Sequence, residues 1–273
     1  LKMKSTVIEQ KMIADGICSM WLDAKEIAVQ AKPGQFISVY SNDKSRVLPR
    51  PISICEIDRE KGTLRIVYRV VGKGTEEKKE IEWDNLLHIR TTGRDDSHSD
   101  QYRYPYEPTS YTVLERLANS GLIRKNNTLI DYGTGKGRVC FYLSYQTRCK
   151  TIGVEYDERI YKGAADNKEV SVSASRTEFV LCSAENYEVP PEVDRCYFFN
   201  PFSVEILQSV LARICESYYE NPRDILLFFY YPSEEYISIL MTQEQLIFYD
   251  EINISDLFPG EDNREKILIF QVL

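Results

Sequence analysis

From about residue 109 onward, short and nearly all-apolar runs alternate with longer segments whose apolar residues recur at helical spacing. Two of the runs, 246–254 and 266–273, lie too close together for a helix between them and predict a hairpin. Strands that are apolar on both faces and separated by helices are typical of a mainly parallel sheet covered on both sides. We therefore expect an α/β fold whose seven-stranded, mainly parallel, Rossmann-like sheet ends in a C-terminal antiparallel hairpin. The other predicted strands are 128–132, 151–155, 178–182, 195–199 and 224–231, and the predicted helices are 109–120, 137–145, 158–173 and 204–219.

The first 75 residues follow a different pattern, in which short apolar runs are separated by turn signals. Strands at this spacing predict a small antiparallel β domain. A charged run over 76–80 then predicts a solvated linker or the start of a helix, and 84–108 is polar. We expect three parts: the β domain over 1–76, a linker and polar leader over 77–108, and the α/β domain over 109–273.

Composition narrows the function classes. The formal net charge of −8 disfavours a broad basic surface for nucleic acid, although a local basic groove stays open. Seven cysteines without a close pair are typical of reduced thiols, and with two histidines we expect no metal site. We see neither an apolar run of membrane-spanning length nor a signal core, and we expect a cytoplasmic protein.

The segment with the clearest chemistry joins the first two strands of the α/β region. Its first strand ends at Asp131 and is followed by Gly133, Gly135 and Gly137; the second strand ends at Glu155. Glycines let the backbone approach a ligand closely, and an acid at the second strand end can bind ribose hydroxyls. The pattern predicts an adenosine-containing cofactor, but NAD and FAD folds also use such a loop.

Two further features favour one cofactor. Asp131 would repel a pyrophosphate and attract an ammonium group, and the fourth strand ends in Asn200-Pro201-Phe202. With these motifs the sequence resembles the class I S-adenosylmethionine-dependent methyltransferases over about 77–273. Asn200-Pro201-Phe202 looks like the signature of amino-methylating members, although Phe202 stands where many members have a second proline. The resemblance implies S-adenosylmethionine as cofactor and methyl transfer to a nitrogen acceptor.

The chemistry of such a site can also be argued from the residues. An Asn200 carbonyl can accept hydrogen bonds from a target amine, and an aromatic face such as Phe202 can stabilise a developing cation. After the third strand, Ser183 and Ala184 take the place where the family contacts adenine, and Ser183 replaces the acid that many members have there. The leader is expected to fold over the cofactor, with Tyr106 and Thr109 closest to it, or to be a polar surface arm.

The N-terminal β domain carries a second resemblance. Residues 35–39, 50–54 and 68–75 look like the flavin-binding barrel of the ferredoxin-reductase superfamily, and most like the electron-transfer subunit of dihydroorotate dehydrogenase. The resemblance covers about 1–76 and implies that FAD is a possible second cofactor, or that the barrel serves as a platform for a protein partner. The flavin contacts it implies are Arg50, Pro51, Ser53, Gly72 and Gly74.

Three functions stay open on the sequence. The leading hypothesis is a methyltransferase whose acceptor is a small molecule, a protein or an RNA. The alternative is a flavin-linked electron-transfer protein with an appended nucleoside-binding domain. The third is a nucleoside-sensing module without catalytic activity.

Overall fold

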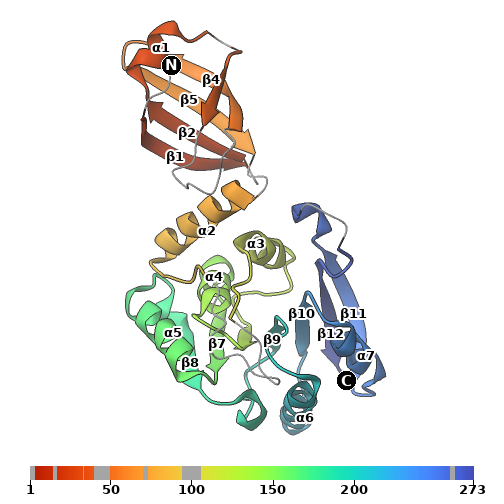
Figure 1. Ribbon diagram of the computed structural model, residues 1–273. Coiled ribbons are helices and arrows are strands. Elements are labelled where there is room, and N and C mark those ends of the chain that lie inside the picture. The colour runs from red at the N-terminus through yellow and green to blue at the C-terminus, as the bar shows by residue number, and fades with distance from the viewer. Residues whose placement is uncertain are drawn as a thin grey trace. The chain divides into compact units, whose positions relative to one another are not determined.

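The computed structural model describes residues 4–14, 17–32, 34–39, 50–69, 73–93, 106–258 and 262–273. Two compact units make up the chain, Leu1–Glu77 and Lys78–Leu273. Figure 1 labels their elements in chain order. No helix in the described ranges is both long and apolar enough to cross a membrane.

The described part of the N-terminal unit contains an antiparallel sheet with the strand order β1-β2-β5-β4-β3. Its small core packs Ala28 of the short helix α1 against Ile54 and Leu64. We did not predict α1, since it has only six residues and no side-chain cap at its start. The bounds are β1 Thr6–Ala14, β2 Ile17–Asp23, α1 Lys25–Gln30, β3 Phe36–Val39, β4 Arg50–Asp58 and β5 Thr63–Arg69.

The charged run that predicted a linker or a helix start forms a helix, α2 (Lys73–Leu87). Its second half belongs to the C-terminal unit, where Leu87 is fully buried. Three polar residues of this half, Lys79, Glu80 and Asp84, take part in hydrogen bonds.

In the described part of the C-terminal unit, a sheet runs in the order β11-β12-β10-β9-β6-β7-β8. Neighbours from β8 through β10 are parallel, whereas β12 is antiparallel to both β10 and β11. The predicted seven-stranded, mainly parallel sheet with a C-terminal hairpin is therefore confirmed. The strands are β6 Thr128–Tyr132, β7 Lys150–Glu155, β8 Thr177–Leu181, β9 Arg195–Phe198, β10 Leu226–Tyr230, β11 Leu246–Asn253 and β12 Lys266–Val272.

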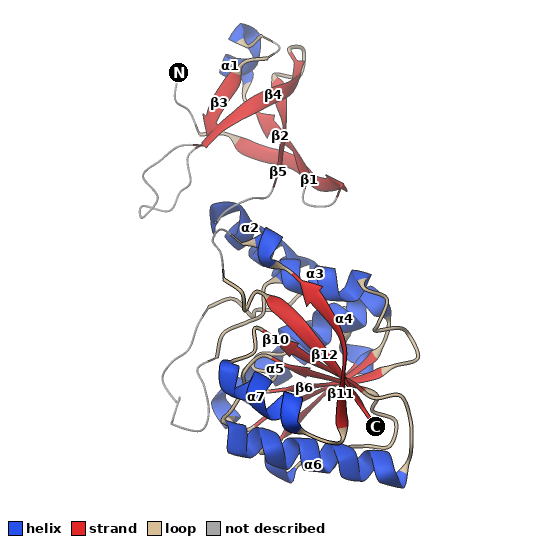
Figure 2. Ribbon diagram, turned by 90° about the vertical axis from the view of Figure 1, so that its right-hand side faces the viewer, coloured by secondary structure: helices blue, strands red, loops and turns tan. Residues whose placement is uncertain are grey.

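Helices cover both faces of this sheet (Figure 2). Successive side chains of a strand point to opposite faces, so an apolar strand offers a surface for helix packing on each side. Ile130 and Phe198 pack with α6 and α7, and Leu129 and Tyr197 pack with α3 and α4 on the other face. The helices are α3 Tyr111–Asn119, α4 Arg138–Thr147, α5 Glu158–Val170, α6 Val204–Glu220 and α7 Glu234–Thr242, with short 3-10 turns η1 Ala174–Arg176, η2 Ala184–Asn186 and η3 Ser255–Leu257.

Helix α7 was not predicted, although its sequence carries a start signal. The Ser233 hydroxyl accepts a hydrogen bond from the Tyr236 amide at 3.2 Å, as a serine at a helix N-terminus commonly does. Glu234 and Glu235 follow in the first turn, where acids favour the helix dipole. The serine and the two acids would have indicated the helix.

Candidate functional site

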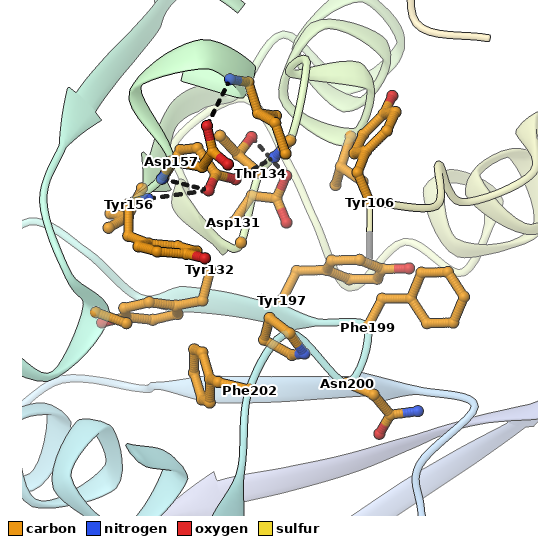
Figure 3. A pocket seen from close by; sticks show the side chains of 18 of the residues that line it. Tyr106, Asp131, Tyr132, Thr134, Tyr156, Asp157, Tyr197, Phe199, Asn200 and Phe202 are labelled. Atoms are coloured by element: carbon orange, nitrogen blue, oxygen red, sulfur yellow. Dashed lines mark hydrogen bonds between the residues drawn. The ribbon is translucent and has the colours of Figure 1, made fainter. Parts of the chain in front are cut away.

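β6 is the middle one of the five parallel strands, with β7 and β8 on one side and β9 and β10 on the other, so the strand order reverses between β6 and β9. In open parallel sheets, ligands bind beyond the carboxyl ends of the strands at such a point. A pocket opens there (Figure 3). The predicted site residues that line it are Tyr106, Thr109, Asp131, Gly133, Gly135, Glu155, Ala184, Asn200, Pro201 and Phe202.

The glycines of the loop are required by backbone conformation and by space. Gly133 and Gly135 have φ of +73° and +60°, which side-chain-bearing residues rarely adopt. A Cβ atom at Gly133 would lie 2.5 Å from Cβ of Pro201, and one at Gly135 would lie 2.2 Å from the ring of Tyr106. Gly137 lies outside the pocket lining, and its missing side chain makes room for the rings of Phe141 and Phe179.

Glu155 organises the loop from the neighbouring strand. One carboxylate oxygen accepts a hydrogen bond from the Gly135 amide at 2.9 Å, and the other accepts from the amides of Tyr156 and Asp157, each at 3.0 Å. Burial raises the pKa of this carboxyl, while the three amides act in the opposite direction. A carboxylate has about four acceptor positions, so Glu155 keeps capacity for a hydroxyl of a ligand.

Asp131 is buried beneath the loop. The Thr134 hydroxyl donates to its carboxylate at 2.8 Å, and the side chain is only 3% exposed. Burial raises the pKa of Asp131 to about 7, and the nearby Glu155 charge adds to this effect. A cation in the pocket would stabilise the ionised form of Asp131 and would itself be stabilised.

Asn200 is held by a neighbouring loop. Its amide nitrogen donates to the Tyr231 carbonyl at 2.6 Å, and its side-chain oxygen accepts from the Ser233 amide at 3.2 Å. Figure 3 shows the carboxamide turned away from Asp131 and Thr134. With a φ of +40°, the residue sits in a conformation that asparagine tolerates better than most side chains. Asn200 therefore lines the pocket while its carboxamide connects the end of β9 to the start of α7.

The two residues after Asn200 form a wall of the pocket. Pro201 packs against Gly133. Phe202 is buried, its ring meets Phe198 edge to face, and its carbonyl accepts a hydrogen bond from the Tyr236 hydroxyl at 2.6 Å. The Phe202 ring is thus packed into the core at the edge of the pocket.

The segment before α3 contributes the opposite side. The Tyr106 hydroxyl donates to the Thr91 carbonyl at 2.6 Å, which leaves its ring against Gly135. The Thr109 hydroxyl lies 3.0 Å from that of Tyr197 on β9. Residues 94–105, which belong to the expected leader, lie outside the described ranges.

Several pocket residues were not predicted from the sequence. Tyr132 is fully buried, and its hydroxyl has no hydrogen-bond partner among the residues that the structure describes. Tyr156, Tyr197 and Arg138 also line the pocket. Tyr156 could have been found, since it directly follows Glu155, but Arg138 reads as an ordinary surface residue at a helix start and is instead 2% exposed.

The remaining predicted site residues lie elsewhere. Ser183 precedes η2, outside the pocket lining. Pro51 and Ser53 are exposed on β4, and Gly74 lies inside α2 rather than in a loop. Gly72 and the side chain of Arg50 lie outside the described residues. The described part of the chain contains no cluster of three or more His, Cys, Asp or Glu residues that could hold a metal.

No protein-family model matches the chain. Its N-terminal region is similar to the electron transfer subunit of dihydroorotate dehydrogenase B (NAD(+)). It is 37% identical over 73 residues to the protein from Geobacillus thermodenitrificans and 45% identical over 71 residues to that from Desulforamulus reducens. Each match covers 26% of this chain and 28% or 27% of the relative. The chain thus spans little more than a quarter of the length of these curated relatives.

Methyltransferases are among the solved structures that resemble the chain. An RNA methyltransferase from Salinibacter ruber in complex with S-adenosyl-L-homocysteine is 13% identical, with a TM-score of 0.46, over 61% of this chain and 94% of that one. An rRNA methylase from Streptococcus thermophilus is 13% identical, with a TM-score of 0.42, over 59% and 93%. Both similarities are distant, and the function proposed below therefore rests on this chain's own pocket.

Proposed function

We propose that the C-terminal unit binds S-adenosylmethionine and transfers its methyl group to an acceptor. The observation that carries the proposal is the arrangement of Asp131 and Glu155. They end adjacent parallel strands on either side of a loop of positive-φ glycines, and both line one pocket.

The residues present fit this cofactor. Glu155 keeps acceptor capacity for ribose hydroxyls, and the buried Asp131 suits an ammonium group. The glycines leave space that a Cβ would fill. A dinucleotide is less compatible, because its pyrophosphate would face a buried acid before the glycines.

The cofactor supplies a methyl group on a positively charged sulfur, which is electrophilic without further activation. The protein has to hold an acceptor in line, so positioning is the main contribution. Pro201 and Phe202 form a fixed wall for this purpose, and the Phe202 ring can stabilise the charge that develops on a nitrogen acceptor by about 0.5–2 kcal/mol.

The charges lining the pocket support an amine acceptor without phosphate groups. Among the described lining residues, Arg138 is the one Lys or Arg, and it is already bonded to Glu80 and to the Thr109 carbonyl. Such a surface repels a phosphate backbone and attracts a neutral or cationic amine. The acidic lining residues are Glu107, Asp131, Glu155, Asp157 and Glu185.

Calorimetry with S-adenosylhomocysteine tests the cofactor, and transfer of a labelled methyl group to a panel of amines, peptides and RNA tests the acceptor. We expect micromolar binding and labelling of an amine-bearing acceptor. Absence of binding by the wild-type protein would exclude the proposed cofactor, and binding without transfer to any pool would favour a nucleoside-sensing module.

A second candidate function is supported by the N-terminal similarity to an electron transfer subunit. We propose flavin binding by the N-terminal sheet as this alternative, with Pro51 and Ser53 on β4 as the candidate residues whose side chains the structure describes. Titration with FAD, followed by visible absorbance and flavin fluorescence, tests it. Unchanged flavin spectra at saturating protein would exclude it.

A further inference from the structure

Arg138 is the first residue of α4, directly after the glycine loop, and its guanidinium is almost completely buried. Its Nε donates to the Thr91 hydroxyl at 2.7 Å, and one terminal nitrogen donates to the Thr109 carbonyl at 3.1 Å. The ring of Tyr111 lies 4.3 Å from the guanidinium carbon. The Arg138 side chain thus bonds to Thr91 and to Thr109, the two residues that flank 92–108.

Two carboxylates of α2 hold this buried cation. Glu80 bonds to Arg138, and Asp84 lies 3.8 Å from its second terminal nitrogen. Asp84 also accepts from the Thr91 amide and hydroxyl, each at 2.6 Å. Because a buried charge is costly without a partner, these contacts make the position of Arg138 depend on α2.

The contacts continue from Arg138 to the cofactor loop. The Thr91 carbonyl accepts the Tyr106 hydroxyl, and the Tyr106 ring lies where a Cβ of Gly135 would be. Gly135 in turn donates its amide to Glu155. Thr109, the other partner of Arg138, bonds to Tyr197 on the opposite side of the pocket.

We propose that Arg138 is a positioning residue of the cofactor site, which holds Tyr106 against the glycine loop and Thr109 at the pocket wall, and that cofactor affinity depends on its contacts with Glu80 and Asp84 of α2. The proposal rests on the proposed cofactor. It assigns a function to the polar residues of α2, whose composition alone indicates a linker. Arg138 acts through Tyr106 and Thr109 and needs no contact with the reacting atoms.

The test compares Arg138→Lys, Tyr106→Phe and the double variant. Lysine keeps the charge but loses the fork that reaches Thr91 and Thr109 together, and phenylalanine removes only the hydroxyl that reaches Thr91. Hydrogen exchange of the free protein is measured at residues 133–137, and the affinity of the folded protein for S-adenosylhomocysteine is measured by calorimetry. We expect each single variant to exchange faster at the Gly135 amide and to bind about three- to tenfold more weakly.

The double variant decides whether the two residues act together. If Arg138 acts through Tyr106, the double variant binds only about as weakly as Arg138→Lys, whereas independent roles would multiply the two effects. Multiplied effects would overturn the proposal, as would unchanged exchange at Gly135 in Arg138→Lys.

Lys79→Met is the matched control. It breaks the ion pair between the buried Lys79 of α2 and the half-buried Glu115 of α3, in which the two groups are 2.6 Å apart, without touching Arg138. We expect a loss of stability with unchanged ligand affinity, and an equal loss of affinity in this control would reduce Arg138 to a structural role. Should the wild-type protein bind no S-adenosylhomocysteine, the proposed cofactor fails, while the exchange measurement still decides the role of Arg138.

Discussion

The Glu155 carboxylate and the Gly135 amide, twenty residues apart in the sequence, are joined by a hydrogen bond of 2.9 Å. The acid that is expected to bind the ribose therefore also shapes the loop that faces the cofactor. Ligand contact and loop geometry are coupled at this residue, so a substitution at Glu155 should affect both.

Glu155→Gln should weaken binding of S-adenosylhomocysteine by about 10- to 100-fold. The amide of glutamine offers one acceptor oxygen where the carboxylate offers two, so an amide of Gly135 or of the 156–157 segment loses its partner. Calorimetry measures the affinity. Glu158→Gln, an exposed acid in the first turn of α5, is the control and should bind as the wild type does.

Asp131→Asn should stabilise the free protein above pH 7 and weaken cofactor binding. The pKa of Asp131 is about 7 in the folded state against about 3.8 ordinarily, so the folded protein favours the protonated acid. The contribution of Asp131 to the stability of the wild type is therefore greatest below about pH 4 and is lost as the pH rises through 7. Asparagine removes that loss.

Urea unfolding at pH 5 and pH 8 measures the effect of Asp131→Asn. We expect the variant to gain about 1–3 kcal/mol at pH 8 and clearly less at pH 5. An equal gain at both values would contradict a raised pKa. Calorimetry at pH 8 should show weaker S-adenosylhomocysteine binding, because asparagine offers no charge to an ammonium group.

The fold followed from the sequence because the central strands of the α/β region are buried on both faces. All five residues of β6 and of β10 are buried, so these strands read as continuous apolar runs with little ambiguity. Helix α2 shows the opposite case. Its glutamates and lysines read as solvated, but Glu80 and the buried Asp84 are partners of an arginine that is distant in sequence.

The part of the candidate site that lies at the ends of β6 and β7 could be predicted from the sequence, because its residue types and spacing are local features. Gly133, Gly135, Asp131 and Glu155 lie at strand ends and meet because the strands are neighbours. The environment of Asn200 was not predictable, because its carboxamide binds Tyr231 and Ser233 from a loop more than thirty residues away. Long-range partners of this kind leave no periodic signal in the sequence.

Gly133→Ala should destabilise the protein and weaken the cofactor site. A methyl group there would meet the Pro201 side chain, 2.5 Å from the new Cβ, in addition to the strain of a positive φ. Gly121→Ala is the control, since Gly121 has a similar φ of +75° with nothing within 4 Å of a Cβ.

Urea unfolding should show a loss of about 1 kcal/mol for Gly121→Ala and about 2–4 kcal/mol for Gly133→Ala. Only Gly133→Ala should weaken S-adenosylhomocysteine binding, because the clash displaces a wall of the pocket. Equal losses of stability in the two variants would mean that Pro201 moves aside without cost.

Asn200→Ala should lower the stability of the protein by about 1–3 kcal/mol, since it leaves the Tyr231 carbonyl and the Ser233 amide unpaired and places alanine at a φ of +40°. Asn200→Gly removes the same hydrogen bonds but relieves the backbone, so it should recover about 1 kcal/mol of that loss. Urea unfolding measures both variants, and S-adenosylhomocysteine affinity should change less than about threefold because binding does not use the carboxamide. If Asn200→Ala instead unfolds like the wild type while methyl transfer falls sharply, the carboxamide is free to turn toward the acceptor, and its predicted role in orienting a target amine is the correct one.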